Sequence, residues 1–160
     1  MQIFILRHGV AESHEAHKAD ARRALTSKGK SEVRRVLSLA RGANLTPDYV
    51  FSSPLLRARE TAAVVKKLFG TKDFVETKSL LPAANPQAMW KELAALKDAK
   101  QVLLAGHEPH LSNLIRFLLG AAVVVDLKKG ALVRIDCEGL LGPPRGVLKW
   151  MLTPRLVRGR

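Results

Sequence analysis

The stretch "QIFILRHG", residues 2–9, decides the fold and raises the question of function. After the first glutamine, its β-branched, aromatic and leucine side chains are typical of a central strand buried on both faces. Arg7, His8 and Gly9 follow directly. A buried strand needs neither an arginine nor a histidine at its end. These residues therefore indicate a functional site where the first strand stops.

The rest of the chain alternates between strand-like and helix-like segments. Apolar runs predict further strands over residues 47–53, 74–76 and 100–106. Apolar side chains at helical spacing predict helices over residues 25–42, 54–70, 86–96 and 108–120. Residues 131–139 and 146–154 surround a turn-rich segment and predict an antiparallel hairpin. We predict an α/β three-layer sandwich with a mostly parallel central sheet, helices on both faces and this C-terminal hairpin.

Length and composition limit the domain count and the kind of partner. The 160 residues suffice for one domain, predicted over residues 1–153 and followed by a basic tail over residues 154–160. Apolar residues make up 47% of the chain, which excludes a disordered protein. The formal net charge of +13 favours anionic partners, namely nucleic acid, an acidic membrane, a phosphorylated protein or a phosphorylated metabolite. Charge alone does not choose among them.

The environment is predicted from the single cysteine and the lengths of the apolar runs. Cys137 excludes a disulfide framework and fits a reducing compartment. No apolar run approaches the roughly 20 residues of a membrane helix. We expect a cytoplasmic monomer that does not bind a membrane. Nucleic acid is a poor candidate partner, because aromatic stacking platforms are scarce.

Polar residues follow the ends of three predicted strands. Arg7, His8 and Gly9 follow the first, Ser53 ends the second and precedes Arg57, and His107 follows the strand over residues 100–106. In parallel α/β sheets, ligands bind at the carboxyl ends of the strands, so we expect these groups at one rim. Guanidinium groups and the first turn of a helix suit phosphate. The sequence therefore predicts a phosphate pocket.

Two histidines beside two arginines also indicate a reaction. A neutral imidazole nitrogen can attack phosphorus and become covalently phosphorylated. Nearby arginines lower the pKa of that histidine and neutralise the charge on the phosphoryl oxygens. A glycine next to the nucleophile lets the backbone approach the phosphate.

Three motifs together carry a family resemblance: "LRHG" at residues 6–9, "SSPLLRARETA" at 52–62 and "GHEP" at 106–109. In this order they resemble the histidine phosphatase superfamily, whose fold is that of phosphoglycerate mutase. The short length, "RHGVAE", "LTSKG" and "GHEPHL" are most similar to the SixA-type phosphohistidine phosphatases. The substrate would then be a phosphorylated signalling protein, such as a phosphotransfer domain, and no cofactor or metal is implied.

The resemblance also implies a role for each matching residue. His8 would be the nucleophile, and Arg7 and Arg57 would bind the phosphoryl group. His107 would hydrogen-bond the same oxygens and could stay protonated. We also expect substrate contacts from the neighbouring motif residues Gly9, Ser53 and Glu108.

The chain departs from many larger members of the family in one segment. These carry a carboxylate that protonates an alkoxide leaving group, but "LLPAANPQAM", residues 80–89, has none. Imidazole is a far better leaving group than an alkoxide, so phosphohistidine needs less help from a general acid. The absence of a carboxylate in this segment therefore favours phosphohistidine as substrate. Glu12 and Glu108, near the motif histidines, are the candidate acids if one is used.

Three alternatives remain open at this point. The same pocket could serve a small-metabolite phosphomonoesterase or pyrophosphatase. The chain could instead be a catalytically weak basic module that binds phosphoproteins. A metal site could use His14 with His17, or His107 with His110, but neither pair has the spacing of a known motif and we expect no metal.

Overall fold

The structure is a computed structural model that describes residues 1–14 and 19–157. Within these residues the α-helices are α1 (Ser27–Gly42), α2 (Leu56–Phe69), α3 (Pro86–Ala94) and α4 (His110–Leu119). The strands are β1 (Gln2–Arg7), β2 (Tyr49–Ser52), β3 (Asp73–Glu76), β4 (Gln101–Gly106), β5 (Leu132–Cys137) and β6 (Gly146–Leu152). Two short 3-10 helices, η1 (Asp20–Arg22) and η2 (Lys78–Leu80), interrupt loops. The predicted fold class is confirmed.

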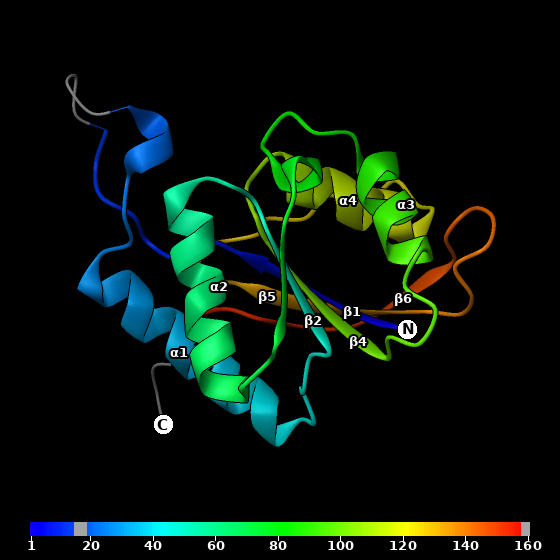
Figure 1. The fold of residues 1–160 in the computed structure, drawn as a ribbon, viewed down its shortest axis with the longest axis horizontal. Helices are drawn as coiled ribbons and strands as arrows, with labels where there is room; N and C mark the ends of the chain where they lie inside the picture. The colour runs from blue at the N-terminus through cyan, green and yellow to red at the C-terminus, as the bar shows by residue number, and fades with distance from the viewer. Residues whose placement is uncertain (15–18, 158–160) are drawn as a thin grey trace.

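One six-stranded sheet, in the order β3-β2-β4-β1-β5-β6, forms the middle layer (Figure 1). Strands β1 to β4 are mutually parallel, whereas β5 pairs antiparallel with β1 and β6 pairs antiparallel with β5. The carboxyl ends of β1, β2 and β4 therefore lie at one edge of the sheet, next to one another. The antiparallel hairpin of β5 and β6 is the one predicted.

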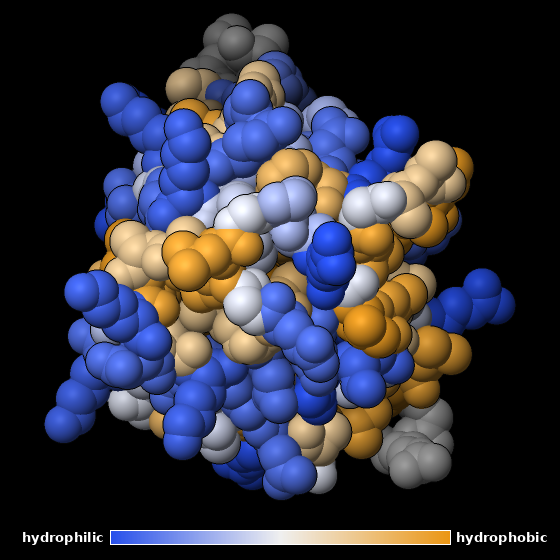
Figure 2. Space-filling view, turned by 90° about the vertical axis from the view of Figure 1, so that its right-hand side faces the viewer, coloured by the Kyte–Doolittle hydropathy of each residue, from blue (hydrophilic) through white to orange (hydrophobic). Residues whose placement is uncertain are grey.

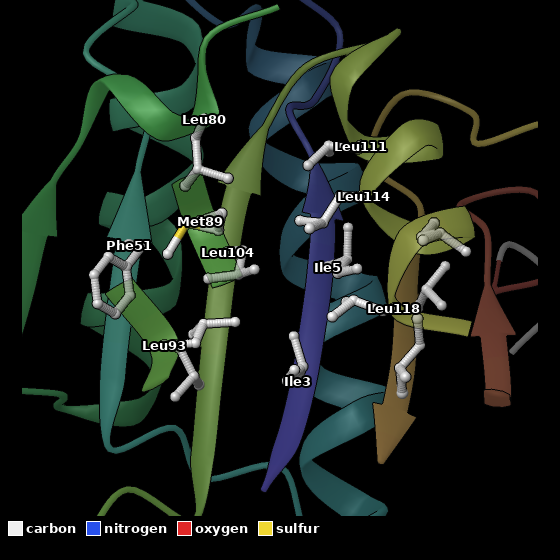
Figure 3. Close-up of a cluster of buried hydrophobic side chains, with 14 of the residues drawn as sticks. Ile3, Ile5, Phe51, Leu80, Met89, Leu93, Leu104, Leu111, Leu114 and Leu118 are labelled. Atoms are coloured by element: carbon white, nitrogen blue, oxygen red, sulfur yellow. The ribbon is translucent and has the colours of Figure 1, made fainter. Parts of the chain in front are cut away.

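Helices cover both faces of the sheet. This arrangement is required because successive apolar side chains of β1 point to opposite faces. Phe4 and Leu6 pack into a cluster with α1 and α2. Ile3 and Ile5 pack into a second cluster, toward Leu114 and other residues of α3 and α4 (Figure 3). A strand buried on both faces has no polar position, which explains the uninterrupted apolar run before Arg7.

The loop after β1 is held tightly against the start of α1. Thr26 caps this helix, because its hydroxyl oxygen accepts a hydrogen bond from the Gly29 N–H at 3.0 Å. Gly29 has to be glycine, since a Cβ there would lie 2.1 Å from the Val10 carbonyl oxygen. The helix thereby fixes the backbone that follows the first motif.

The described part of the predicted tail lies on the domain. Pro154 is buried, and Val157 packs into the cluster beneath α1 and α2. Residues 158–160 lie outside the described residues. The boundary at residue 153 stays a prediction.

The end of the molecule where β1 begins is opposite to the edge that carries the motifs. This end faces the viewer in Figure 2, and hydrophilic and hydrophobic side chains are interspersed on it. Among the described residues, no helix has the length and apolar character needed to cross a membrane.

Candidate active site

The three motifs meet at the carboxyl ends of β1, β4 and β2, as predicted. Arg7 pairs with Gly106, and Ser52 pairs with Ala105, so the residues after these strands are neighbours. The rings of His8 and His107 lie 5.1 Å apart between centroids. Arg57 reaches this edge from the first turn of α2 and is 4% exposed.

His8 is buried and is held in one tautomer. Its Nδ1 lies 2.8 Å from the Gly9 carbonyl oxygen. A carbonyl only accepts hydrogen bonds, so Nδ1 carries the proton and Nε2 of the neutral ring keeps its lone pair. Burial lowers the pKa of His8 to about 4; the Gly9 hydrogen bond opposes this shift, and the positive charges of Arg57, Arg7 and Lys129 add to it. His8 is therefore neutral at pH 7.

Arg57 is oriented by a residue from another loop. Its Nη1 donates to the Asp20 carbonyl oxygen at 2.9 Å, and its Nη2 donates to Asp20 Oδ2 at 3.1 Å. Partial burial raises the pKa of Asp20, but hydrogen bonds and charges from Arg23 and Arg57 outweigh it, so this pKa lies below its usual value. Asp20 is therefore an ionised partner that holds the guanidinium in place.

Arg7 is oriented by the segment that precedes β5. Its Nη1 donates to the Leu127 carbonyl oxygen at 2.7 Å. The Gly130 N–H donates to the carbonyl oxygens of both Arg7 and His8, at 3.1 and 3.0 Å. Residues 127–130 therefore hold His8 and the neighbouring Arg7 in place together.

His107 is buried against Ser53. Its Nε2 lies 2.8 Å from the Ser53 hydroxyl oxygen, which also accepts a hydrogen bond from the Leu55 N–H at 3.3 Å. Burial, followed by the charges of His8 and Arg57, lowers the pKa of His107 to about 3. In the free protein His107 is thus neutral, whereas the resemblance implied that it could stay protonated. The reason is that its ring is buried close to the positive charges of Arg57 and Arg7 and next to His8.

Three buried nitrogens of the site have no hydrogen-bond partner among the described residues: Arg7 Nε, Arg57 Nε and His107 Nδ1. Buried polar groups in native proteins are nearly always hydrogen-bonded. The two arginine Nε–H groups are donors, and such unused donors beside a neutral histidine suit an oxyanion. The arrangement has the chemical character of a phosphate pocket.

Gly9 is required by close packing. A Cβ at this position would lie 2.9 Å from the Gly29 carbonyl oxygen and 3.0 Å from Val33 Cγ2, both in α1. The Gly9 N–H donates to Thr61 Oγ1 at 3.2 Å, and the Thr61 hydroxyl donates to the Arg57 carbonyl oxygen at 2.7 Å. The predicted contact between Gly9 and substrate stays a prediction.

The other predicted contacts and candidate acids have protein partners. Ser53 is fully buried and bonds to His107. The Glu108 carboxylate accepts hydrogen bonds from the N–H and the hydroxyl of Ser112, in the first turn of α4. The Glu12 carboxylate accepts a hydrogen bond from the Ala24 N–H at 3.3 Å. Both glutamates therefore have a structural function in the free protein.

Of the two histidine pairs considered as metal ligands, only His107 and His110 both lie within the described residues. His110 Nδ1 lies 2.9 Å from the Ala84 carbonyl oxygen, to which it donates. Where the chain is described, no three His, Cys, Asp or Glu side chains are arranged to hold a metal ion. His17 lies outside the described residues.

Two residues of the site were missed by the sequence analysis. Asp20 lies in a polar segment without periodicity, 37 residues before the arginine that it contacts. Nothing in the sequence distinguishes it from the other charged residues there. Thr61 carries a weak signal, since it lies one helical turn after Arg57 within the second motif.

The sequence of the chain is similar to a known family and to a known protein. Residues 3–81 match the model of the histidine phosphatase superfamily (branch 1). An uncharacterized protein from Picosynechococcus sp. is 32% identical over 116 residues, which cover 71% of this chain and 70% of that protein.

Solved structures share the fold over nearly the whole chain. The protein histidine phosphatase SixA, solved with tungstate, is 24% identical, with a TM-score of 0.87 over 99% of this chain and 100% of its own. The alpha-ribazole phosphatase from Shigella flexneri is 17% identical, with a TM-score of 0.75 over 96% and 97%. At these identities the likeness shows the fold, and it agrees with the predicted resemblance to SixA-type proteins. The family match confirms the predicted enzyme class: the chain is a phosphatase that belongs to the histidine phosphatase superfamily.

Proposed function

We propose that the enzyme hydrolyses phosphohistidine on a signalling protein through a covalent phospho-His8 intermediate. The observation that carries this proposal is the neutral His8 ring, whose Nδ1 proton is held by the Gly9 carbonyl, beside the unpartnered buried nitrogens of Arg7, Arg57 and His107. A nucleophilic nitrogen and the donors for a phosphoryl group thus lie at the same edge of the sheet.

In the first step, His8 Nε2 attacks phosphorus and the P–N bond of the substrate breaks. The electron pair of that bond returns to the substrate imidazole, which leaves neutral when its second nitrogen carries a proton. Arg7 and Arg57 donate hydrogen bonds to the phosphoryl oxygens and neutralise their charge. Proton transfer from the enzyme is therefore unnecessary in this step.

In the second step, water attacks phosphorus of phospho-His8. The new P–O bond forms while the P–Nε2 bond breaks, so His8 returns to its neutral form and inorganic phosphate is released. The Gly9 carbonyl keeps the proton on Nδ1 throughout, and Nε2 stays the reacting atom.

The carboxylates near the site support a P–N rather than a P–O substrate. Asp20 is ionised and paired with Arg57, and Glu108 bonds to Ser112. An alkoxide leaving group needs a protonated acid, whereas imidazole does not. The fold similarity to SixA, a protein histidine phosphatase, supports the same choice.

The test is to trap the intermediate. Wild-type enzyme mixed with labelled phosphoramidate and quenched in base should carry one acid-labile, base-stable phosphate on His8. The variant His8→Ala should carry none, whereas His14→Ala, at an exposed position, should label like wild type. An unlabelled wild-type enzyme under single-turnover conditions contradicts the mechanism.

The second candidate function is that of a phosphomonoesterase for a small metabolite. The fold similarity to the alpha-ribazole phosphatase from Shigella flexneri favours it. Turnover of free phosphohistidine and of alkyl phosphates separates the two functions. Our proposal requires kcat/KM for phosphohistidine to exceed that for alkyl phosphates by orders of magnitude, and equal values would favour the metabolite phosphatase.

A further inference from the structure

We infer that the surface beside the site, formed by residues 123–129, β6 and the start of α1, docks an acidic protein substrate. This inference rests on the proposed function and adds where the phosphorylated partner binds. Two grooves make up the surface. The basic groove has a volume of about 590 Å³. Four cations, Lys28, Lys128, Lys129 and Arg155, and two carboxylates, Glu32 and Asp126, are among the residues that line it. The apolar groove has a volume of about 320 Å³ and is lined by Val124, Leu148 and Met151, among others.

The basic groove lies close to the nucleophile. Lys129 lies close enough for its charge to lower the pKa of His8, and the adjacent Gly130 N–H donates to the His8 carbonyl oxygen. Val10, two residues after His8, lines the groove. At the other side, Arg155 follows the end of β6, which lies at the same sheet edge because Leu6, Leu132 and Leu152 are paired in register.

The basic groove exposes positively charged side chains to which a partner can bind. Lys28, Lys129 and Arg155 are exposed, and none forms an ion pair within residues 1–14 and 19–157. Lys128 is paired with Asp126 at 2.6 Å. Since exposed cations without partners attract and orient an acidic surface, this groove suits acidic side chains around the phosphorylated histidine.

The apolar groove continues the basic one, because Asp126 and Met151 line both. Val124 is fully exposed, Leu148 is 49% exposed and Met151 is 40% exposed. An exposed apolar patch with a polar border is typical of a protein interaction site. The phosphates of a nucleic acid would match only the basic groove. A second copy of this chain, itself at +13, would be repelled.

The experiment separates docking from chemistry. Its probes are a phosphorylated histidine phosphotransfer domain of net negative charge and free phosphohistidine. The double variant K28E/R155E reverses two charges of the basic groove, and Val124→Asp places a charge at the apolar groove. Matched controls at the opposite edge are K72E/K97E and Leu141→Asp, all at exposed positions before β3 and β4 or between β5 and β6.

We expect K28E/R155E to lower kcat/KM for the phosphorylated domain about tenfold and Val124→Asp to lower it about threefold, because both act on association. Values for free phosphohistidine should stay within about twofold of wild type, and the controls should behave as wild type with both probes. Added salt should reduce wild-type kcat/KM for the domain and have little effect on K28E/R155E. Equal losses with both probes, or no loss with the domain, overturn the inference.

A binding measurement keeps the two proposals distinguishable. If wild type hydrolyses neither probe, the proposed function fails, and docking is then decided by fluorescence titration with the unphosphorylated acidic domain. Weaker binding by K28E/R155E supports the inference, and unchanged binding overturns it. Tighter binding of a 20-nucleotide single-stranded DNA than of the domain, also lost in K28E/R155E, overturns the choice of a protein partner.

Discussion

Both terminal nitrogens of Arg57 bond to Asp20, one to its backbone carbonyl and one to its carboxylate. The arginine expected to bind phosphate thus already has an anion beside it in the free protein. The carboxylate orients the guanidinium, but it also repels an incoming phosphate. Asp20 therefore helps to hold Arg57 in position, but it lowers the affinity of the site for anions.

The substitution Asp20→Asn should separate these two effects. Asparagine keeps an acceptor for Arg57 Nη2 and removes the negative charge. We expect the inhibition constant of inorganic phosphate, the reaction product, to fall about threefold, the range of a single partly exposed charge pair. Asp136→Asn is the control, because Asp136 pairs with Arg134 within β5 at 2.8 Å. Weaker inhibition by phosphate in Asp20→Asn would contradict the prediction.

The substitution Arg57→Lys should remove most of the activity. Lysine keeps the charge but loses the planar fork that can bond Asp20 and a phosphoryl oxygen at once. We expect kcat/KM to fall about a hundredfold. Arg59→Lys, two residues on at a largely exposed position that pairs with Glu76, should leave kcat/KM unchanged. An unchanged kcat/KM in Arg57→Lys would contradict the prediction and would show that the charge, rather than the fork, matters.

The two histidines should titrate far below an ordinary histidine. Burial holds the pKa of His8 at about 4 and that of His107 at about 3. Nitrogen-15 chemical shifts of both rings, assigned with His8→Asn and His107→Asn, should therefore stay constant from pH 8 to 5. A midpoint near 6.5 for His8 would show that this ring is exposed and partly protonated at neutral pH.

The same pKa values have a consequence for stability, whose sign follows from linkage. Unfolding returns each ring to a pKa of 6.5, so below that pH the unfolded chain binds more protons than the folded one. The free energy of unfolding should therefore decrease as pH falls from 6.5 toward 4. Denaturant melts should show a smaller decrease for His107→Asn than for wild type.

The substitution Gly9→Ala should act through packing. Its Cβ would meet the backbone of α1 at 2.9 Å, so the loop or the helix has to move. We expect a loss of about 1–3 kcal/mol in the free energy of unfolding, as for other overpacked positions. Gly42→Ala at the end of α1 is the control, because no atom lies within 4 Å of a Cβ there. It should be neutral or stabilising by up to about 1 kcal/mol in urea denaturation.

The convergence of Arg7, His8, Arg57 and His107 was predictable, because parallel strands bring their carboxyl ends to one edge. The apolar run of β1 identifies a central strand, and every polar residue after such a strand lies at that edge. Each of the three motifs could be found locally, as polar residues that follow an apolar run. The rule that parallel strands end at one edge then predicts that the three motifs form one site.

The orientation of the arginines was not predictable, because it depends on single contacts between distant loops. Asp20 and Leu127 hold Arg57 and Arg7 through a side chain and a carbonyl that no periodicity marks. The protonation state of His107 depends on burial next to His8, which the sequence cannot measure. The function of Gly9 in packing likewise depends on how closely α1 approaches.

The central place of β1 has a consequence for the synthesis of this protein. His8 lies within the first ten residues, yet both neighbours of the strand that precedes it, β4 and β5, begin only at residues 101 and 132. Such long-range pairing is slow compared with local helix formation. On the ribosome, the surroundings of His8 therefore cannot form until almost the whole chain has been synthesised. A nascent or truncated polypeptide would contain the "RHG" motif without the pocket that makes it reactive.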